Sequence, residues 1–188
     1  MITQPFLRGL DLPRHPAPRA DALVPLTELH AFPDISTAAK SHHAKRFGSA
    51  AELLCDSLLM RLGIDSHPSP EFQAFDRLIY LDDRPLRLQI KVRLSAENNA
   101  FWFKVAHGNP RHASGVRGYR QDAFDLLALV ILHHNVVKFS ASKASKQQIA
   151  LSEIPCLRDH PFESLRCALN ALELSETLDE APAQLNAA

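Results

Sequence analysis

One alternating stretch constrains the fold of this chain more than any other. Residues 86–94 read Leu-Arg-Leu-Gln-Ile-Lys-Val-Arg-Leu, so large aliphatic side chains alternate with polar or charged ones. Successive side chains on a strand point to opposite faces of a sheet, and this pattern therefore predicts a strand with one buried face. Gln89 and Lys91 are expected to share the other face.

A second apolar run, residues 72–81, comes just before this strand, and the polar sequence Asp-Asp-Arg-Pro between them has the composition of a tight turn. The two runs predict a β-hairpin with Asp76 near the start of its first strand. We expect Asp76, the Gln89 amide oxygen and the Ile90 carbonyl to offer oxygen ligands to Mg²⁺ or Mn²⁺. Lys91 would then orient a water molecule or stabilise charge on a phosphate.

Helical spacing precedes the hairpin. Residues 37–46 predict a helix capped by Asp34 or Ser36, Gly48 interrupts it, and residues 50–62 predict a stronger helix. Glu52 is expected in the first turn of the second helix. Two interpretations of Glu52 stay open: a charge favoured by the helix dipole, or a second carboxylate for the metal site.

The remaining chain predicts several further elements. The apolar run 125–132 is a central buried strand or a buried helix, and its length and the polar turn that follows favour a strand. The other expected elements are strands over 64–67, 100–106, 136–140 and 148–151, the last two joined as a hairpin near Ser142; a polar, mobile loop over 107–118; and an acidic amphipathic helix over 161–178.

The distribution of charge says more than its total, which is zero. Residues 84–146 hold eleven Lys and Arg against three acids, and the segments on either side are acidic. A basic middle fits a polyanion as partner, and a solvated sheet face with scattered arginines is the alternative. The three cysteines form no CxxC pair; Cys55 and Cys167 are expected to be buried thiols, and a reducing cytoplasm fits. The N-terminus does not read as a signal peptide, and no apolar run is long enough for a membrane span.

The order of these features resembles the PD-(D/E)xK nuclease superfamily. It is most similar to the small branch, including group I intron homing endonucleases, whose third motif is Gln-x-Lys. The resemblance covers roughly residues 45–152, and these residues carry it: Gly48, Glu52, Leu58, Leu59 and Gly63; Phe75-Asp76; Gln89-Ile90-Lys91; Tyr119; Asp125-Leu-Leu-Ala-Leu; and Val136-Val-Lys-Phe-Ser140.

The resemblance implies an α/β, restriction-endonuclease-like core with a central mixed β-sheet flanked by helices. It implies a catalytic site of Asp76, Gln89, Lys91 and Glu52, with Asp76, Gln89, Ile90 and Glu52 around the metal, and DNA as substrate. Two residues depart from the superfamily pattern. Phe75 stands where the motif has a proline, a weak departure because that proline is often absent. Gln89 replaces an acid, which lowers the charge that holds the metal.

Three parts are expected: a proline-rich N-terminal arm (1–33), the nuclease-like domain (34–155) and an acidic C-terminal helix with a tail (156–188). The arm is interpreted as an oligomerisation arm, a DNA-contacting arm or a disordered tail. Asp125 is expected to cap or orient the strand that follows it.

Our first hypothesis is a cytoplasmic, divalent-metal-dependent endodeoxyribonuclease that acts as a homodimer or larger assembly. The residues expected to hold the DNA backbone are Arg87, Arg93, Arg111, Arg117, Arg120, Lys143 and Lys146. The second hypothesis is a catalytically inactive module of the same fold that binds nucleic acid or a protein partner. A third is an unrelated α/β protein in which Asp76 and Lys91 lie far apart.

Overall fold

The structure is a computed structural model that describes residues 26–81, 84–108 and 115–173. The chain divides into two compact units, Met1–His42 and His43–Ala188, and each is described by itself. Most of the predicted N-terminal arm lies outside the described residues.

The first unit holds the 3₁₀ helix η2 (Leu26–Ala31) and the helix α1 (Thr37–His42). Ser36 caps α1, because its Oγ accepts a hydrogen bond from the Ala39 amide at 3.0 Å. The same hydroxyl donates to Glu28 Oε2 at 3.2 Å and so ties α1 to η2. Of the two residues expected to cap this helix, Ser36 is confirmed.

The second unit is built on a five-stranded mixed sheet in the order β1-β2-β3-β7-β8. Neighbours are antiparallel except for the central pair β3 and β7, which is parallel. The strands are β1 (Asp65–Pro68), β2 (Arg77–Leu81), β3 (Arg84–Val92), β7 (Leu126–Ile131) and β8 (Val136–Ser140). The predicted α/β class and the central mixed sheet flanked by helices are confirmed.

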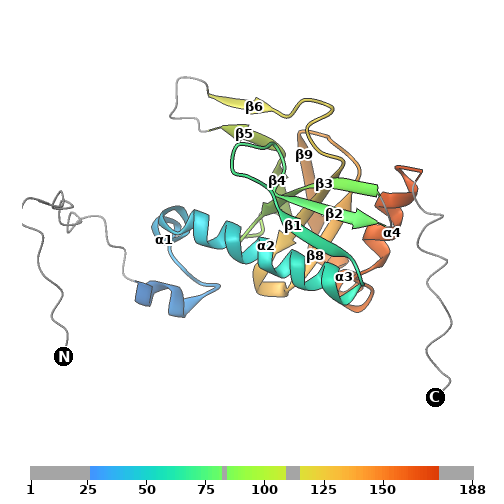
Figure 1. Ribbon diagram of the computed structural model, residues 1–188. Helices are drawn as coiled ribbons and strands as arrows, with labels where there is room; N and C mark the ends of the chain where they lie inside the picture. The colour runs from blue at the N-terminus through green and yellow to red at the C-terminus, as the bar shows by residue number, and fades with distance from the viewer. Residues whose placement is uncertain (1–25, 82–83, 109–114, 174–188) are drawn as a thin grey trace, which may run out of the picture. The chain divides into compact units, whose positions relative to one another are not determined.

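One face of this sheet is covered by α2 (Ala44–Arg61) and α4 (Glu163–Asn170), as Figure 1 shows. Leu58 and Leu59 of α2 pack with Leu88 and Ile90 of β3, and Leu165 of α4 joins the same core. The aliphatic face of the predicted alternating strand is therefore the buried face. In the described part of the chain, each helix is too short or too polar to cross a membrane.

The other face of the sheet is covered by a two-stranded antiparallel sheet of β4 (Ala100–Lys104) and β9 (Lys146–Ala150), and by α3 (Ile154–Asp159). Phe101 and Ile149 of this layer pack against Leu127 and Leu129 of β7. Every residue of β7 is buried, because the strand lies between two apolar layers. The prediction of a central buried strand over 125–132 is confirmed.

Two short strands and two 3₁₀ helices complete the described part of the second unit. β5 (Ala106–Gly108) and β6 (Val116–Gly118) pair as a separate antiparallel ribbon, which rises above β3 and β4 in Figure 1. The 3₁₀ helices η3 (Leu132–His134) and η4 (Leu151–Glu153) lie next to β7 and β9 in the chain. The expected polar loop over 107–118 thus contains paired strands at both of its ends.

Several local predictions are wrong. Gly48 does not interrupt a helix; it lies inside α2, and the break comes at His43. A helical glycine costs only about 1 kcal/mol relative to alanine, and the buried stripe of Phe47, Ala51 and Cys55 outweighs that cost. Glu52 therefore sits mid-helix, where the dipole effect of a first turn does not apply.

The predicted hairpin of residues 136–140 and 148–151 is also wrong. β8 pairs with β7, whereas β9 pairs with β4 in the second sheet. The first strand of the hairpin predicted to carry Asp76 is shorter than expected. Turns and bends occupy residues 71–74, and β2 begins at Arg77. Of the helix expected over 161–178, α4 (Glu163–Asn170) is the helical part among the described residues, and residues 174–178 lie outside them. Cys167 is exposed, contrary to the prediction, while Cys55 is buried as predicted.

Candidate active site

Asp76 and Gln89 face each other across the β2–β3 hairpin. The register pairs Arg77 with Leu88, and the Asp76 amide donates to the Leu88 carbonyl at 2.9 Å, which continues the ladder by one residue. Asp76 Oδ2 accepts a hydrogen bond from the Gln89 side-chain nitrogen Nε2 at 2.5 Å and another from the Ile90 backbone amide at 2.7 Å. Three of the residues predicted for the site are thus together.

The side-chain nitrogen of Gln89 lies between two of the predicted oxygen ligands, those of Asp76 and Ile90. One contact runs to Asp76 Oδ2, and the other is a 3.2 Å hydrogen bond to the Ile90 carbonyl oxygen. Gln89 is only 5% exposed, so these bonds satisfy a buried polar group. The Asp76 carboxylate oxygen and the Ile90 carbonyl oxygen therefore point at the same place, and the Gln89 side-chain NH₂ group occupies it in this structure.

Lys91 lies two residues further along the same face of β3 and has a hydroxyl partner. Its Nζ donates to Tyr119 Oη at 2.8 Å and also stands 5.0 Å from the centre of the Tyr119 ring. The ring of His107 in β5 packs against the Tyr119 ring, with centroids 5.1 Å apart. The ring of Tyr119 in turn packs edge-on against buried Phe124, which fixes the hydroxyl that meets Lys91.

Burial sets the electrostatics of these groups. Desolvation raises the pKa of Asp76, although the Ile90 amide and the Lys91 ammonium favour its charged form. Desolvation lowers the pKa of Lys91, and the nearby Asp76 charge opposes that shift. Burial, followed by the charge of Asp76, raises the pKa of Tyr119 to about 12, so this hydroxyl stays protonated at neutral pH. Perturbed groups clustered in this way are typical of functional sites.

The same groups line a pocket of about 500 Å³ between the hairpin and the β5–β6 ribbon. Asp76, Gln89 and Lys91 form its polar wall, and Phe72 and His107 belong to its lining on other segments. Among the described residues, no three His, Cys, Asp or Glu side chains gather as a metal-binding cluster. A cation here would therefore depend on one carboxylate and neutral oxygens.

Glu52 has a different partner. Its Oε2 accepts a hydrogen bond from Arg77 Nη1 at 2.9 Å, and the Arg77 Nε and Nη2 atoms bind both oxygens of Asp56 at 2.9–3.1 Å. Arg77 Nη1 also donates to the Asp76 backbone carbonyl at 2.9 Å. Glu52 is thus linked to the site through the buried Arg77. The sequence pattern held no signal for Arg77, because a single arginine at the start of a strand is common.

Three of the arginines expected to contact DNA are paired with acids. Arg87 forms a two-point ion pair with Asp125, whose Oδ2 also accepts the Arg87 amide at 2.8 Å. Asp125 thus anchors the strand it precedes to β3, in agreement with the orienting role expected of it. The other two pairs are exposed and lie close in the chain: Arg93 with Glu97, and Arg120 with Asp122, both at 3.1 Å.

The remaining basic residues predicted to bind DNA lie around the β5–β6 ribbon and the ends of β4 and β9. Arg117 is exposed on β6, and Lys143 Nζ binds the Gln121 carbonyl and lies 5.8 Å from the Phe124 ring. Lys146 Nζ stands 5.0 Å from the centre of the Trp102 ring. Arg111 lies outside the described residues. The role of this set in DNA binding stays a prediction.

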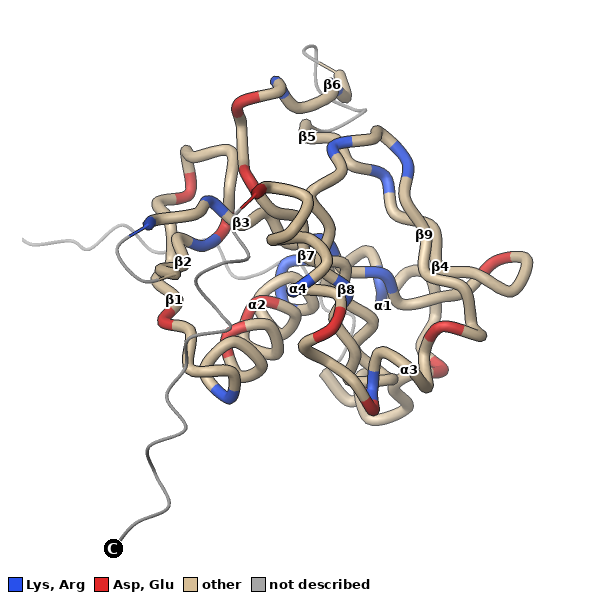
Figure 2. The backbone as a smooth tube through the Cα atoms, turned by 90° about the vertical axis from the view of Figure 1, so that its right-hand side faces the viewer, with Lys and Arg blue, Asp and Glu red and all other residues tan. Residues whose placement is uncertain are grey.

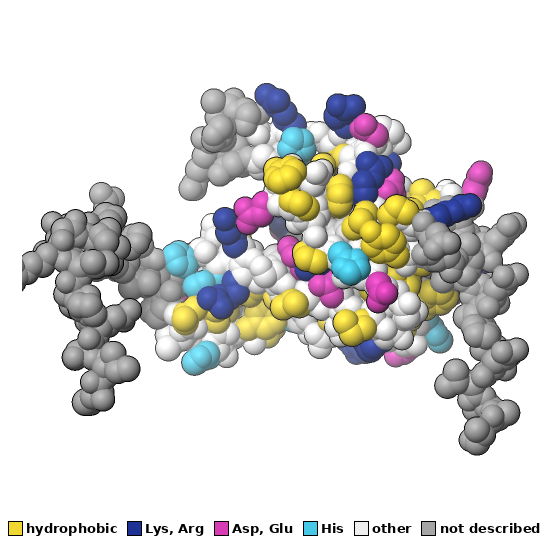
Figure 3. Space-filling model, in the orientation of Figure 1, with side chains coloured by type: hydrophobic (Ala, Val, Ile, Leu, Met, Phe, Trp, Pro, Cys, Tyr) yellow, Lys and Arg dark blue, Asp and Glu magenta, His cyan; other side chains and the backbone are white. Residues whose placement is uncertain are grey.

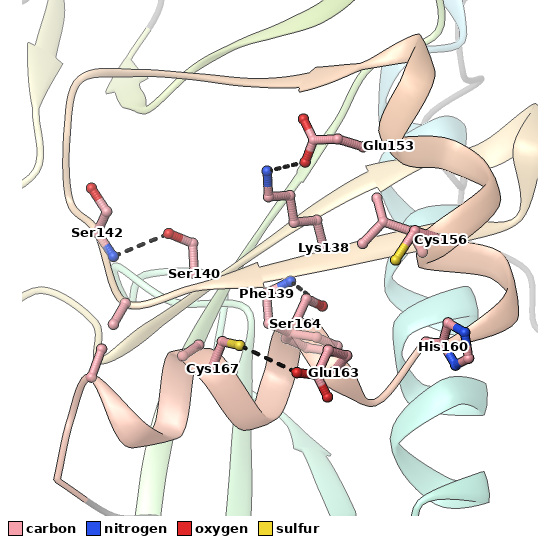
Figure 4. A pocket seen from close by; sticks show the side chains of 14 residues that line it. Lys138, Phe139, Ser140, Ser142, Glu153, Cys156, His160, Glu163, Ser164 and Cys167 are labelled. Carbon is pink, nitrogen blue, oxygen red and sulfur yellow. Dashed lines mark hydrogen bonds and ion pairs between the residues drawn. The ribbon is translucent and has the colours of Figure 1, made fainter.

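A second pocket, of about 450 Å³, lies between β8, α3 and α4 (Figure 4). It brings Cys156, Cys167 and His160 to one hollow, but its charged groups are already engaged: Lys138 binds Glu153, and Cys167 Sγ lies 3.8 Å from Glu163 Oε1. Its lining is mainly apolar. This pocket lacks the convergent oxygen atoms of the Asp76 pocket, and we do not assign the chemistry to it.

The comparisons with known proteins do not identify a family. The sequence matches no family model, and the search of curated proteins finds no match. Among solved structures, this chain is similar to that of a bacterial homing endonuclease, I-Ssp6803I, with a TM-score of 0.49 and 13% sequence identity, over 61% of this chain and 78% of that one. A similarity at this level does not assign an activity.

Proposed function

We propose that this protein is a divalent-metal-dependent endodeoxyribonuclease with its active site at Asp76, Gln89, Ile90 and Lys91. The observation that supports the proposal most is the convergence of the Asp76 carboxylate and the Ile90 carbonyl on the Gln89 amide nitrogen, with Lys91 beside them in one pocket. All these ligand atoms are oxygens once the Gln89 amide presents its carbonyl end, and hard cations such as Mg²⁺ or Mn²⁺ prefer such a set.

The donor set fits a cation that is held together with its substrate. Asp76, the Ile90 carbonyl and the Gln89 amide oxygen would hold Mg²⁺ or Mn²⁺. Such an ion supplies charge neutralisation at a phosphate and hydroxide near neutral pH. A single carboxylate binds Mg²⁺ weakly, and magnesium sites commonly draw further ligands from water and substrate phosphates. We therefore expect metal affinity to rise when DNA is bound.

Lys91 supplies the positive charge beside these oxygen atoms in the same pocket. Its ammonium is mostly buried, and the hydrogen bond to Tyr119 fixes its direction. A cation in this position stabilises the negative charge that develops on a phosphate under attack, and it can hold the attacking water by hydrogen bonding. Cutting both strands of a duplex requires two such sites, so a homodimer or larger assembly is expected.

The test is cleavage of supercoiled, linear and branched DNA with Mg²⁺ or Mn²⁺, comparing the wild type with Lys91→Met. Methionine keeps the length of the chain but not its charge, and the rate is expected to fall at least about a hundredfold, the scale of one electrostatic or acid–base group. Lys45→Met, at an exposed position of α2, is the matched control and should cut like the wild type. Equal cutting by both variants would contradict the role of Lys91.

A second candidate function is a DNA-binding module without catalysis. The ion pair between Glu52 and Arg77 favours it, because it engages the carboxylate that would have strengthened the metal site. Thermal unfolding in the presence of Mn²⁺ separates the two candidates. A nuclease should be stabilised by Mn²⁺ and DNA together, and Asp76→Asn should lose this effect. A module should bind DNA with no Mn²⁺ effect that depends on Asp76.

A further inference from the structure

The two-stranded sheet of β4 and β9 has one apolar face and one polar face. Phe101, Phe103 and Ile149 point into the core. Since side chains alternate along a strand, Trp102 and Lys104 of β4 lie on the opposite face, together with their cross-strand partners Gln148 and Lys146. Both lysines and Gln148 are exposed, and Trp102 is half-buried. We call Trp102, Lys104, Lys146 and Gln148 the lysine face.

Two like charges stand directly opposite each other on this face. Lys104 pairs in register with Lys146, an arrangement that disfavours the folded sheet. None of the ion pairs of the described residues involves either lysine. The ammonium group of Lys146 stands over the Trp102 ring, with Nζ 5.0 Å from its centre. The lysine face therefore holds positive charge that the described acids do not neutralise.

A pocket of about 490 Å³ lies at the end of this face. Lys104, Lys146 and Ser145 line it from one side, and Arg117 of β6 lines it from the other. Basic residues gather at this end of β4 and β9, next to β5 and β6 (Figure 2), and basic side chains also stand along the edge of the molecule that carries the ribbon (Figure 3). A hollow with three cationic side chains fits an anion.

The β5–β6 ribbon connects this pocket to the candidate active site. Ala106 lines both pockets. His107 and Gly108 line only the pocket of Asp76, whereas Arg117 and Gly118 line only the basic one. A polyanion that leaves the Asp76 pocket over the ribbon thus arrives at the lysine face. A free phosphate would fill one pocket only, and a chain of phosphates would span both.

We propose that the lysine face and its pocket bind the phosphate backbone of double-stranded DNA whose scissile phosphate lies in the Asp76 pocket. This inference rests on the proposed function for the identity of the polyanion. Lysines act as point charges on phosphates, so the contact adds affinity and orientation without reading sequence. Lys104 and Trp102 were not among the residues that the sequence predicted to bind DNA.

The expected effect follows from counterion release. Each lysine that neutralises a phosphate contributes about 0.9 to the slope of log affinity against log salt, so Lys104→Gln with Lys146→Gln should reduce that slope by about 1.8. If affinity at 1 M salt is unchanged, the loss at 0.1 M is roughly eightfold for each lysine. The control is Arg158→Gln on α3, an exposed cation that lines neither of the two pockets.

The experiment is a titration of the full chain with a DNA duplex at several salt concentrations, without added metal. Trp102 is the only tryptophan of the chain, so its fluorescence reports on the lysine face directly. We expect the emission to change when DNA displaces Lys146 from the ring in the wild type and in Arg158→Gln. Lys104→Glu serves as a second variant, because an ion pair with Lys146 should preserve the sheet and still weaken DNA binding.

The outcomes separate this inference from the proposed function. A smaller slope of log affinity against log salt in the lysine variants, with kcat kept and KM raised, supports both the lysine face and the proposed nuclease. A reduced slope in a chain that cuts no DNA supports the lysine face and contradicts the nuclease. An unchanged slope and unchanged tryptophan emission, in variants that still fold, contradict the lysine face even if the chain is a nuclease.

Discussion

Replacing Arg77 by methionine tests how the site is held together. The guanidinium donates three hydrogen bonds from Nε and Nη2 to the two oxygens of Asp56, and Nη1 bridges Glu52 and the Asp76 carbonyl. The side chain is 9% exposed, while those of Glu52 and Asp56 are 32% and 24% exposed. Methionine fills a similar volume, so the change removes the charge and its hydrogen bonds with little loss of packing.

The magnitude follows from what is left unpaired. Breaking a buried ion pair by removing one partner costs about 3–5 kcal/mol, and hydrogen bonds to charged groups contribute about 1.5–3 kcal/mol each without being additive. Because both carboxylates keep access to water, we expect the lower end, about 3 kcal/mol. For a chain of this size, that corresponds to a fall in Tm of about 6–12 °C.

Calorimetric or denaturant unfolding of Arg77→Met and of Glu52→Gln measures this loss, and the double variant completes the cycle. Glu52→Gln keeps the size of the side chain, and we expect it to cost about 1 kcal/mol in the wild type and close to nothing when Arg77 is already absent. A coupling near zero would show that the ion pair contributes no stability. A loss below about 1 kcal/mol in Arg77→Met would refute the estimate.

The same variants decide the role of Glu52. An acid whose partner is Arg77 should affect stability more than metal affinity. Glu52→Gln is therefore expected to keep the stabilisation by Mn²⁺ and DNA. If Glu52→Gln removed that stabilisation as completely as Asp76→Asn, Glu52 would be a metal ligand, as the resemblance implies.

Two further changes test charged contacts made by residues of β3. Gln89→Glu adds a second carboxylate to the pocket. Without metal, we expect repulsion between the two like charges to lower the stability, and with Mn²⁺ we expect a larger rise in Tm than in the wild type. An equal rise in Tm would argue against Gln89 as a metal ligand. Burial would raise the pKa of Asp125, but hydrogen bonds from the Arg87 guanidinium and amide outweigh it and hold the pKa below its usual range. The folded state then binds this proton less tightly than the unfolded state, so the stabilisation is complete above about pH 4 and is lost as the pH falls through the lower, folded-state pKa. The stability difference between the wild type and Asp125→Asn should narrow on acidification below about pH 4, and a difference independent of pH would contradict this.

Local sequence patterns predicted the elements that build the site. The alternation of Leu88, Gln89, Ile90 and Lys91 placed two residues in the core and two on the pocket side, because a strand buried on one face requires that period. The continuous apolar run of β7 predicted a central strand. This prediction succeeds because a strand covered by apolar layers on both faces needs apolar side chains at every position. The hairpin also brings Asp76 opposite Gln89, which follows from a register that pairs Leu81 with Arg84.

Non-local pairings could not be predicted in the same way. β8 and β9 are close in the chain but belong to different sheets, because each finds its partner in a strand that comes earlier in the sequence. The partner of Glu52 depends on how α2 packs against β2, and no spacing within the helix encodes it. The hydrogen bond from Lys91 to Tyr119 joins residues 28 apart, so the sequence offered no more than the two residue types.

Single-turnover cleavage of DNA by the wild type and by Asp76→Asn, measured over a titration of Mg²⁺ at equal and saturating DNA occupancy, tests the central claim most directly. We expect the wild type to cut DNA with a rate that rises and saturates with Mg²⁺, and Asp76→Asn to bind DNA but cut it at least about a hundredfold more slowly. Equal rates for the two proteins, or cutting that does not depend on the metal, would contradict a metal-dependent active site at Asp76.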